Sequence, residues 1–154
     1  MEQEHVDWAN GVPLMAGPFQ LGLYEPSPET AGYWEGLRSD KLMIKRCTGC
    51  GKHAHPRRLF CTACNSDQLE YVEVSGKGSV YTFSTVHRAP RPEFNAEVPY
   101  TVGLLELEEG VYFFSRILPP PGGEVFIGAN VRLTFRETGP SGRLPAFQII
   151  DASK

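Results

Sequence analysis

All four cysteines of the chain lie within residues 47–64, as two Cys-x2-Cys pairs, Cys47/Cys50 and Cys61/Cys64, separated by ten residues. Each pair directs two sulfurs at one point, and two such pairs complete a tetrahedral shell of four thiolates, the geometry that Zn²⁺ prefers. Because four thiolates leave no open coordination position, the predicted zinc is structural rather than catalytic. A redox-active Cys-x2-Cys site is the alternative, but redox chemistry would not need the second pair.

Charge is distributed unevenly around these cysteines. Residues 37–64 contain seven Lys or Arg and one acid, whereas residues 1–36 contain six acids and no Lys or Arg, in a chain of net charge −3. The asymmetry indicates a local patch that attracts anions, or a solvated face. Arg57 and Arg58 lie beside the second cysteine pair, and guanidinium groups suit the phosphates of coenzyme A or a nucleic acid and the carboxylates of a protein partner equally well. His53 and His55 are expected to face solvent or phosphate rather than the metal.

The sequence before the cysteines predicts an extended arm, a helix and a strand. Residues 1–26 show no periodicity and contain three prolines, which predicts an extended arm. Ser27 and Pro28 are typical of a helix start, and the helix is expected to end near Arg38. Residues 41–46 alternate polar and apolar side chains, which predicts the strand that enters the first cysteine pair.

The remainder predicts a small barrel. Five strand patterns follow the cysteines, at residues 79–87, 100–107, 111–118, 130–137 and 145–151. Five short strands are typical of an OB-type barrel. The predicted fold class is therefore mainly β, with an N-terminal helix and four-cysteine zinc ribbon followed by a five-stranded OB-type barrel. The predicted domains are an arm (1–27), helix plus ribbon (28–68) and barrel (69–154).

Three finer expectations concern the barrel. Strict alternation at 79–87 places Val80 and Thr82 on one face and Tyr81 on the other, with a bulge near the glycines that precede the strand. The adjacent aromatics of the third strand, residues 112–114, are expected to be core. His87 and Arg88, together with an exposed Phe94 in the proline-rich loop 89–99, are candidate contacts for a ligand or partner.

Composition narrows the function classes. No apolar run approaches the roughly 20 residues that span a bilayer, and the acidic N-terminus does not resemble a signal peptide, so a cytoplasmic protein without a membrane partner is expected. A nucleic-acid surface is disfavoured by the net charge and by the acids of strands 100–118. Independent catalysis is not expected, because the cysteines are committed to metal and no nucleophile motif surrounds the serines.

The order of parts resembles a known family. The segments that carry the resemblance are Tyr-Trp-Glu-Gly-Leu at 33–37, the four cysteines, Pro56-Arg57, Gly-Lys-Gly-Ser-Val at 76–80, Pro99-Tyr100, Leu-Glu-Leu-Glu-Glu-Gly at 105–110 and Ile127-Gly128. Together they resemble the zinc-ribbon plus OB-fold proteins associated with acyl-CoA metabolism. The resemblance covers residues 28–151.

This resemblance implies an accessory subunit. It would dock on a thiolase-superfamily enzyme, such as a thiolase, an acyltransferase or a side-chain-cleaving aldolase of steroid or lipid degradation, and help complete or stabilise its active site. The implied assembly is a heterotetramer of two plus two, with structural Zn²⁺ and a coenzyme A thioester as a shared ligand. The alternatives are a hydratase-like partner acting on an enoyl-CoA and, less favoured, a nucleic-acid-binding OB-fold protein.

Overall fold

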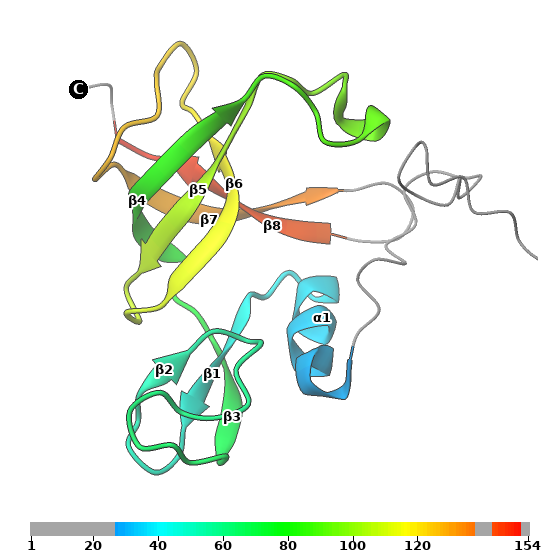
Figure 1. Cartoon of the computed structure of the whole chain (residues 1–154). Coiled ribbons are helices and arrows are strands. Elements are labelled where there is room, and N and C mark those ends of the chain that lie inside the picture. Colours follow the sequence, from blue (N-terminus) through cyan, green and yellow to red (C-terminus); the bar gives the residue numbers. More distant parts are fainter. Residues whose placement is uncertain (1–26, 138–142, 152–154) are drawn as a thin grey trace, which may run out of the picture.

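The computed structural model describes residues 27–137 and 143–151. They form one short α-helix, a three-stranded ribbon and a closed five-stranded barrel, so the predicted fold class is confirmed (Figure 1). Residues 1–26 of the predicted arm lie outside the described residues. Among the described residues, no helix is long and apolar enough to cross a membrane.

The helical segment starts at the predicted place. A 3₁₀ turn, Pro28–Thr30, leads into α1, Ala31–Arg38. The fixed φ of proline suits the first helical position, where its missing N–H has no partner to lose. Leu37 is the buried residue of α1, and Tyr33 and Trp34 pack partly against the same core.

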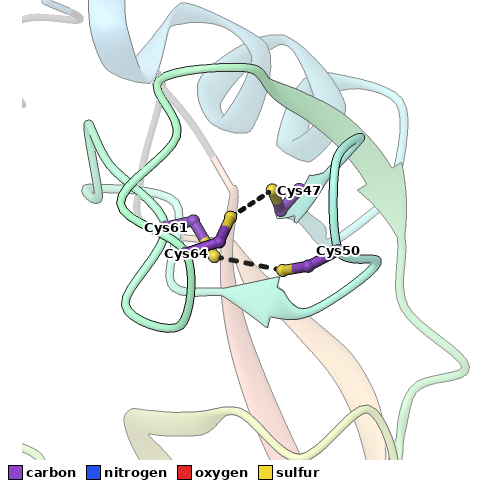
Figure 2. Close-up of side chains that lie close together, drawn as sticks. All are labelled: Cys47, Cys50, Cys61 and Cys64. Atoms are coloured by element: carbon purple, nitrogen blue, oxygen red, sulfur yellow. Dashed lines mark hydrogen bonds between the residues drawn. The ribbon is translucent and has the colours of Figure 1, made fainter.

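The ribbon contains one predicted strand and two that were not predicted. β1, Met43–Cys47, pairs antiparallel with β2, His53–Ala54, on one edge and with β3, Leu69–Glu73, on the other. The cysteine turns extend from this small sheet and bring the four thiols together (Figure 2). β3 lies just beyond the predicted division at residue 68, although it pairs with the ribbon.

The barrel strands begin and end within two residues of the predicted ones. They are β4, Lys77–Val86; β5, Tyr100–Leu107; β6, Tyr112–Leu118; β7, Asn130–Glu137; and β8, Arg143–Ile149. The closed order is β4-β5-β6-β8-β7, in which β6 and β8 run parallel and the other neighbours antiparallel. A five-stranded Greek-key closure of this kind is the OB-fold architecture.

The strict alternation predicted for β4 is wrong at Tyr81. The register with β5 shifts between Val80 and Thr82, so the bulge lies at Tyr81 rather than at the preceding glycines. An extra residue reverses the faces that follow it. Val80 and Phe83 therefore both face the core, whereas Tyr81 and Thr82 are exposed. Gly78 serves another purpose, because a Cβ there would lie 2.5 Å from the carbonyl oxygen of Glu106 on β5.

The expectation that the aromatics of β6 are all core is also wrong. Phe113 is buried, but Tyr112 and Phe114 on either side of it are exposed. Successive side chains of a strand point to opposite faces, so three adjacent aromatics cannot all face inward.

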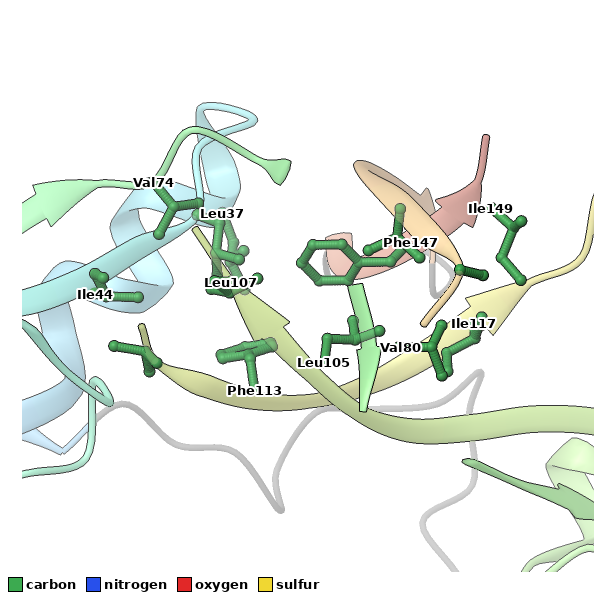
Figure 3. Close-up of a cluster of buried hydrophobic side chains, with 14 residues drawn as sticks. Leu37, Ile44, Val74, Val80, Leu105, Leu107, Phe113, Ile117, Phe147 and Ile149 are labelled. Atoms are coloured by element: carbon green, nitrogen blue, oxygen red, sulfur yellow. The ribbon is translucent and has the colours of Figure 1, made fainter. Parts of the chain in front are cut away.

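One hydrophobic core joins the ribbon to the barrel. Leu37 from α1, Ile44 from β1 and Val74 after β3 belong to the same buried cluster as Leu107 and Phe113 of the barrel (Figure 3). An ion pair between Asp40, after α1, and Arg143, at the start of β8, links the two parts at the surface. The barrel therefore holds the ribbon at a fixed position.

Candidate metal centre and the adjoining ribbon loop

The two cysteine turns have the same local construction. The amide of Gly51 donates to the carbonyl of Cys47 (2.8 Å), and the amide of Asn65 donates to the carbonyl of Cys61 (3.0 Å). Gly51 and Asn65 each follow the second cysteine of their pair, and both have a positive φ, of 76° and 59°. Glycine and asparagine are the residues that tolerate this conformation best. The sequence therefore folds each pair into the same tight turn.

The four sulfurs meet at one point. All lie within 4.8 Å of one another, and the Cys47–Cys64 and Cys50–Cys61 Sγ pairs are 3.5 Å apart (Figure 2). Zn–S bonds of about 2.3 Å in a tetrahedron place sulfurs about 3.8 Å apart. All four cysteines are free rather than disulfide-bonded. The donor set and its geometry therefore fit a closed, structural Zn²⁺ site.

The electrostatics of the cluster also fit a cation. Hydrogen bonds from the amides of Cys64 and Ala63 lower the pKa of Cys61 to about 6. The amide of Ser66 lowers the pKa of Cys64, but the neighbouring cysteine sulfurs outweigh it and raise that pKa to about 12. Four adjacent thiolates repel one another, and a bound dication removes this penalty.

A buried lysine fixes the ribbon loop, which is defined here as residues 55–60. Lys45 on β1 is buried, and its Nζ donates to the carbonyl of Arg58 (2.9 Å) and lies 5.3 Å from the centre of the Tyr71 ring. Burial lowers the pKa of Lys45, against the attraction of Glu29. Lys45 therefore positions the loop and adds little to the exposed charge of the ribbon.

His55, the first residue of the ribbon loop, faces the barrel and not solvent or phosphate as expected. Its ring stacks on Phe113 of β6, with the centroids 5.5 Å apart. Its Nδ1 accepts a hydrogen bond from the amide of Arg57 (3.3 Å), and its carbonyl accepts one from the amide of Arg58 (2.9 Å). Burial, Arg57 and Arg58 lower its pKa, so the neutral ring is favoured.

The titration of His55 gives a first prediction. Its imidazole should protonate below the ordinary pKa of 6.5, as followed by NMR on the zinc-loaded protein. Because the folded pKa is lowered, stability should fall as pH drops from 6.5 toward the folded pKa, where only the unfolded state binds the proton. His55→Phe keeps the stacked ring and should lose this part of the pH dependence. An unshifted His55 titration would contradict the assignment.

The ribbon loop presents charge and apolar surface together. Arg57 and Arg58 are exposed, and so are Leu59 and Phe60, which are about half exposed. Within residues 27–137 and 143–151, neither arginine has an ion-pair partner. Sequence reasoning found the arginines but missed the two apolar residues, although their position directly before Cys61 ties them to the metal turn. The loop can contact an anionic group and an apolar surface at once.

The other candidate contacts lie at the far end of the barrel. His87 and Arg88 are exposed just after β4, the ten-residue strand that begins next to the ribbon. Phe94 lies in the 3₁₀ turn Pro92–Phe94, and it is half-buried against Tyr100 (6.4 Å between centroids) rather than exposed. The connection between β4 and β5, which contains these three residues, lies at the end of the barrel away from the ribbon strands β1–β3 (Figure 1).

Sequence reasoning missed an ionic cluster that holds the β4–β5 loop. One carboxylate oxygen of Glu97 contacts Arg116 on β6 (2.9 Å) and Arg136 on β7 (2.6 Å). The Arg116 guanidinium also lies 3.7 Å from the centre of the Tyr100 ring. The two arginines lower the pKa of Glu97 against the effect of burial. No short sequence pattern joins these residues, because they come from three separate segments.

Family models match most of the described chain. Residues 34–70 match the ChsH2 rubredoxin-like zinc ribbon domain, and residues 71–136 match the ChsH2 C-terminal OB-fold domain. The two matches meet between β3 residues Glu70 and Tyr71.

Individual relatives agree with these matches. A DUF35 domain-containing scaffold protein of Methanocaldococcus jannaschii is 38% identical over 111 residues, which are 71% of this chain and 78% of the relative. The benzoylsuccinyl-CoA thiolase subunit BbsA of Thauera aromatica is 29% identical over 85 residues, 55% of this chain and 57% of the relative. A chain of the solved Ltp2-ChsH2(DUF35) aldolase is 32% identical, with a TM-score of 0.71, covering 81% of this chain and 97% of that one.

Other relatives are longer proteins. The chain spans a little over a third of the length of two hydratase alpha subunits that it matches, 37% of a probable enoyl-CoA hydratase alpha subunit and 34% of a 3-oxo-4,17-pregnadiene-20-carboxyl-CoA hydratase alpha subunit. These relatives are 33% and 35% identical to it over the matched residues.

Proposed function

Because the chain belongs to the family of ChsH2-type zinc-ribbon and OB-fold proteins, which includes the DUF35 scaffold proteins, we propose that it is an accessory subunit of a thiolase-like enzyme. In this role it docks on an enzyme that makes or breaks a carbon–carbon bond in an acyl-CoA of lipid or steroid degradation, and it helps complete or stabilise that active site. The names of the aldolase complex and of the thiolase subunit among its relatives support this class of partner.

The observation that carries the proposal is the rigid presentation of the ribbon loop. The metal turn fixes one end of the loop, Lys45 fixes its middle and His55 joins it to Phe113 of the barrel. A loop held in this way loses little conformational entropy when it binds, so more of the contact energy contributes to affinity. Such a loop is suited to docking on a partner protein.

The ligand and the assembly are finer parts of the proposal. A coenzyme A thioester is the proposed shared ligand, with Arg57 and Arg58 available to its phosphates or to partner carboxylates. The proposed assembly has two copies of each subunit, since a dimeric partner would impose its two-fold axis. The helix plus ribbon and the barrel are the proposed structured units, with β3 at their junction.

A hydratase-like partner is the second candidate. The hydratase alpha subunits that contain a region similar to this chain favour it. Such a partner would add water to an enoyl-CoA instead of cleaving or forming a carbon–carbon bond, while the accessory role of this chain stayed the same.

Affinity purification from the source cell, followed by mass spectrometry, tests both candidates. A stoichiometric thiolase-like protein is the expected result. A hydratase alone would replace the first candidate with the second. Recovery of RNA or DNA without either enzyme would contradict both.

Reversal of the loop charges gives a second prediction. Arg57→Glu combined with Arg58→Glu should weaken association with the co-purified enzyme by about tenfold or more, because contacts to anionic groups become repulsive. Zinc content should not change. The matched control is Arg46→Glu with Lys52→Glu, which makes the same charge change at exposed ribbon positions outside the loop. Equal affinity of the loop variant and the wild type would remove the arginines from the interface.

A further inference from the structure

Exposed aromatic side chains gather on one side of the barrel. Tyr81 on β4 is 53% exposed, and Tyr112 and Phe114 on β6 are 46% and 62% exposed. The rings of Tyr81 and Tyr112 meet edge to face, with their centroids 4.9 Å apart, although β5 separates the two strands. These three residues are called the aromatic face below.

Strand register makes this face continuous. Phe114 lies opposite Leu104 on β5, which lies opposite Thr82 on β4, so these three side chains form one row across the outside of the barrel. Tyr112 lies opposite Glu106 and begins the next row. Leu104 is half-buried on β5, the strand between β4 and β6. The face is therefore a connected surface and not a set of isolated side chains.

The bulge and a neighbouring loop extend the face. The register shift at Tyr81 turns that ring outward. The loop before β7 hydrogen-bonds to β4, since the amide of Gly128 donates to the carbonyl of Val80 (2.7 Å). Ile127, 65% exposed, lies in that loop. Four of the seven large hydrophobic residues exposed in the described part of the chain thus lie on or beside this face.

The charges on these strands disfavour a nucleic acid. Glu106 lies beside Tyr112, and its charge is the main cause of the raised pKa of that tyrosine. Two basic side chains lie on β4, β5 and β6. Arg116 pairs with Glu97 and stacks on Tyr100, so Lys77, the first residue of β4, is the other one. An OB fold that binds single-stranded nucleic acid needs Lys or Arg side chains for the phosphates together with aromatic side chains on which the nucleobases stack.

The same features favour a protein. Large exposed apolar patches with a polar rim mark interaction sites. Tyrosine and phenylalanine are enriched in the cores of protein interfaces, where rigid rings bury much area at little entropic cost. A carboxylate at the edge of such a patch complements a basic side chain of the partner.

We propose that the aromatic face is a docking surface for the thiolase-like enzyme, which meets it with an apolar patch rimmed by Lys or Arg. This inference rests on the proposed function and adds to it a second contact surface, acidic at its edge, in addition to the basic ribbon loop. Tyr112 and Phe114 supply two of its three exposed rings, and aromatic side chains of this kind often carry much of the binding energy of an interface.

The test compares variants in complex formation with the co-purified thiolase-like enzyme, by surface plasmon resonance on the zinc-loaded full chain. Tyr112→Ser combined with Phe114→Ser should weaken association at least about tenfold, because two of the three exposed rings are lost. Glu106→Lys should also weaken it. Tyr112→Phe keeps the ring, and Ile150→Ser removes an exposed side chain outside β4–β6; both should bind as the wild type does.

Three results would overturn the inference. In the first, the double variant is folded by circular dichroism and yet binds the enzyme normally. In the second, the wild type binds labelled oligo(dT) and the double variant does not. In the third, the wild type self-associates in light scattering and the double variant does not. The first result leaves the proposed function intact. Absence of any thiolase-like protein from the wild-type purification contradicts the proposed function and this inference together.

Discussion

Replacement of Cys61 with Ser is expected to abolish zinc binding and to unfold the ribbon. The zinc-binding free energy of small zinc domains is about 10–16 kcal/mol at neutral pH, which is as large as the whole stability of a typical domain, about 5–15 kcal/mol. The ribbon has one small sheet, and the metal joins its two cysteine turns, so loss of the metal removes the link between them. Metal analysis by mass spectrometry and far-ultraviolet circular dichroism measure the two effects.

Unfolding of the ribbon should also destabilise the barrel. Ile44 of β1 and Val74, which follows β3, belong to the same core as Leu107, so an unfolded ribbon uncovers part of the barrel. Thermal unfolding should therefore begin at a lower temperature. Thr62→Ala, at the exposed neighbouring position, should retain zinc and the wild-type transition. A soluble Cys61→Ser protein that lacks zinc but keeps the native spectrum and transition would contradict a structural site.

Phe113→Ala should cause the largest loss of stability outside the metal ligands. The ring of Phe113 packs against the rings of His55 in the ribbon loop, Tyr33 of α1 and Phe147 of β8. Its centroid lies 6.4 Å from each of the last two, so one side chain joins three parts of the fold. Truncation of a buried phenylalanine costs about 3–5 kcal/mol. Urea unfolding of the zinc-loaded protein measures this loss, and hydrogen exchange should show faster opening of the ribbon.

The neighbouring residue supplies the control for this prediction. Phe114→Ala makes the same chemical change one position along β6, but on the exposed face of the strand. Its effect should stay within about 0.5 kcal/mol. Similar losses for the two variants would show that Phe113 does not join the ribbon to the barrel.

The local features of the fold were predictable from sequence. Cysteine spacing specified the metal turns, because two residues between ligands set the local geometry of each pair. Periodicity specified the five barrel strands, because period-two alternation needs only neighbouring residues. Ser27 and Pro28 marked the helical start. Strands β2 and β3 were missed, since a two-residue strand has no periodicity and β3 is half-buried without clear alternation.

The faces of the strands were less predictable. One bulge at Tyr81 reversed the orientation of the residues beyond it, and the sequence of β4 contains no glycine at that position to indicate the bulge. A strand pattern indicates that one face is buried but gives no sign of a local register shift, which depends on pairing with a distant strand. The exposure of Tyr81 therefore emerged from the pairing of β4 with β5.

The sequence by itself determined the metal chemistry, the barrel class and the family, because each depends on short local motifs and on their order along the chain. Only the tertiary structure decided what the charged and aromatic side chains do. Lys45 faces the ribbon loop, His55 stacks on Phe113, and Glu97 joins two distant arginines. These contacts arise where the ribbon packs on the barrel or where the barrel closes. Spacing along the chain carries no record of such long-range contacts, so the proposed aromatic docking surface could be recognised only in the folded chain.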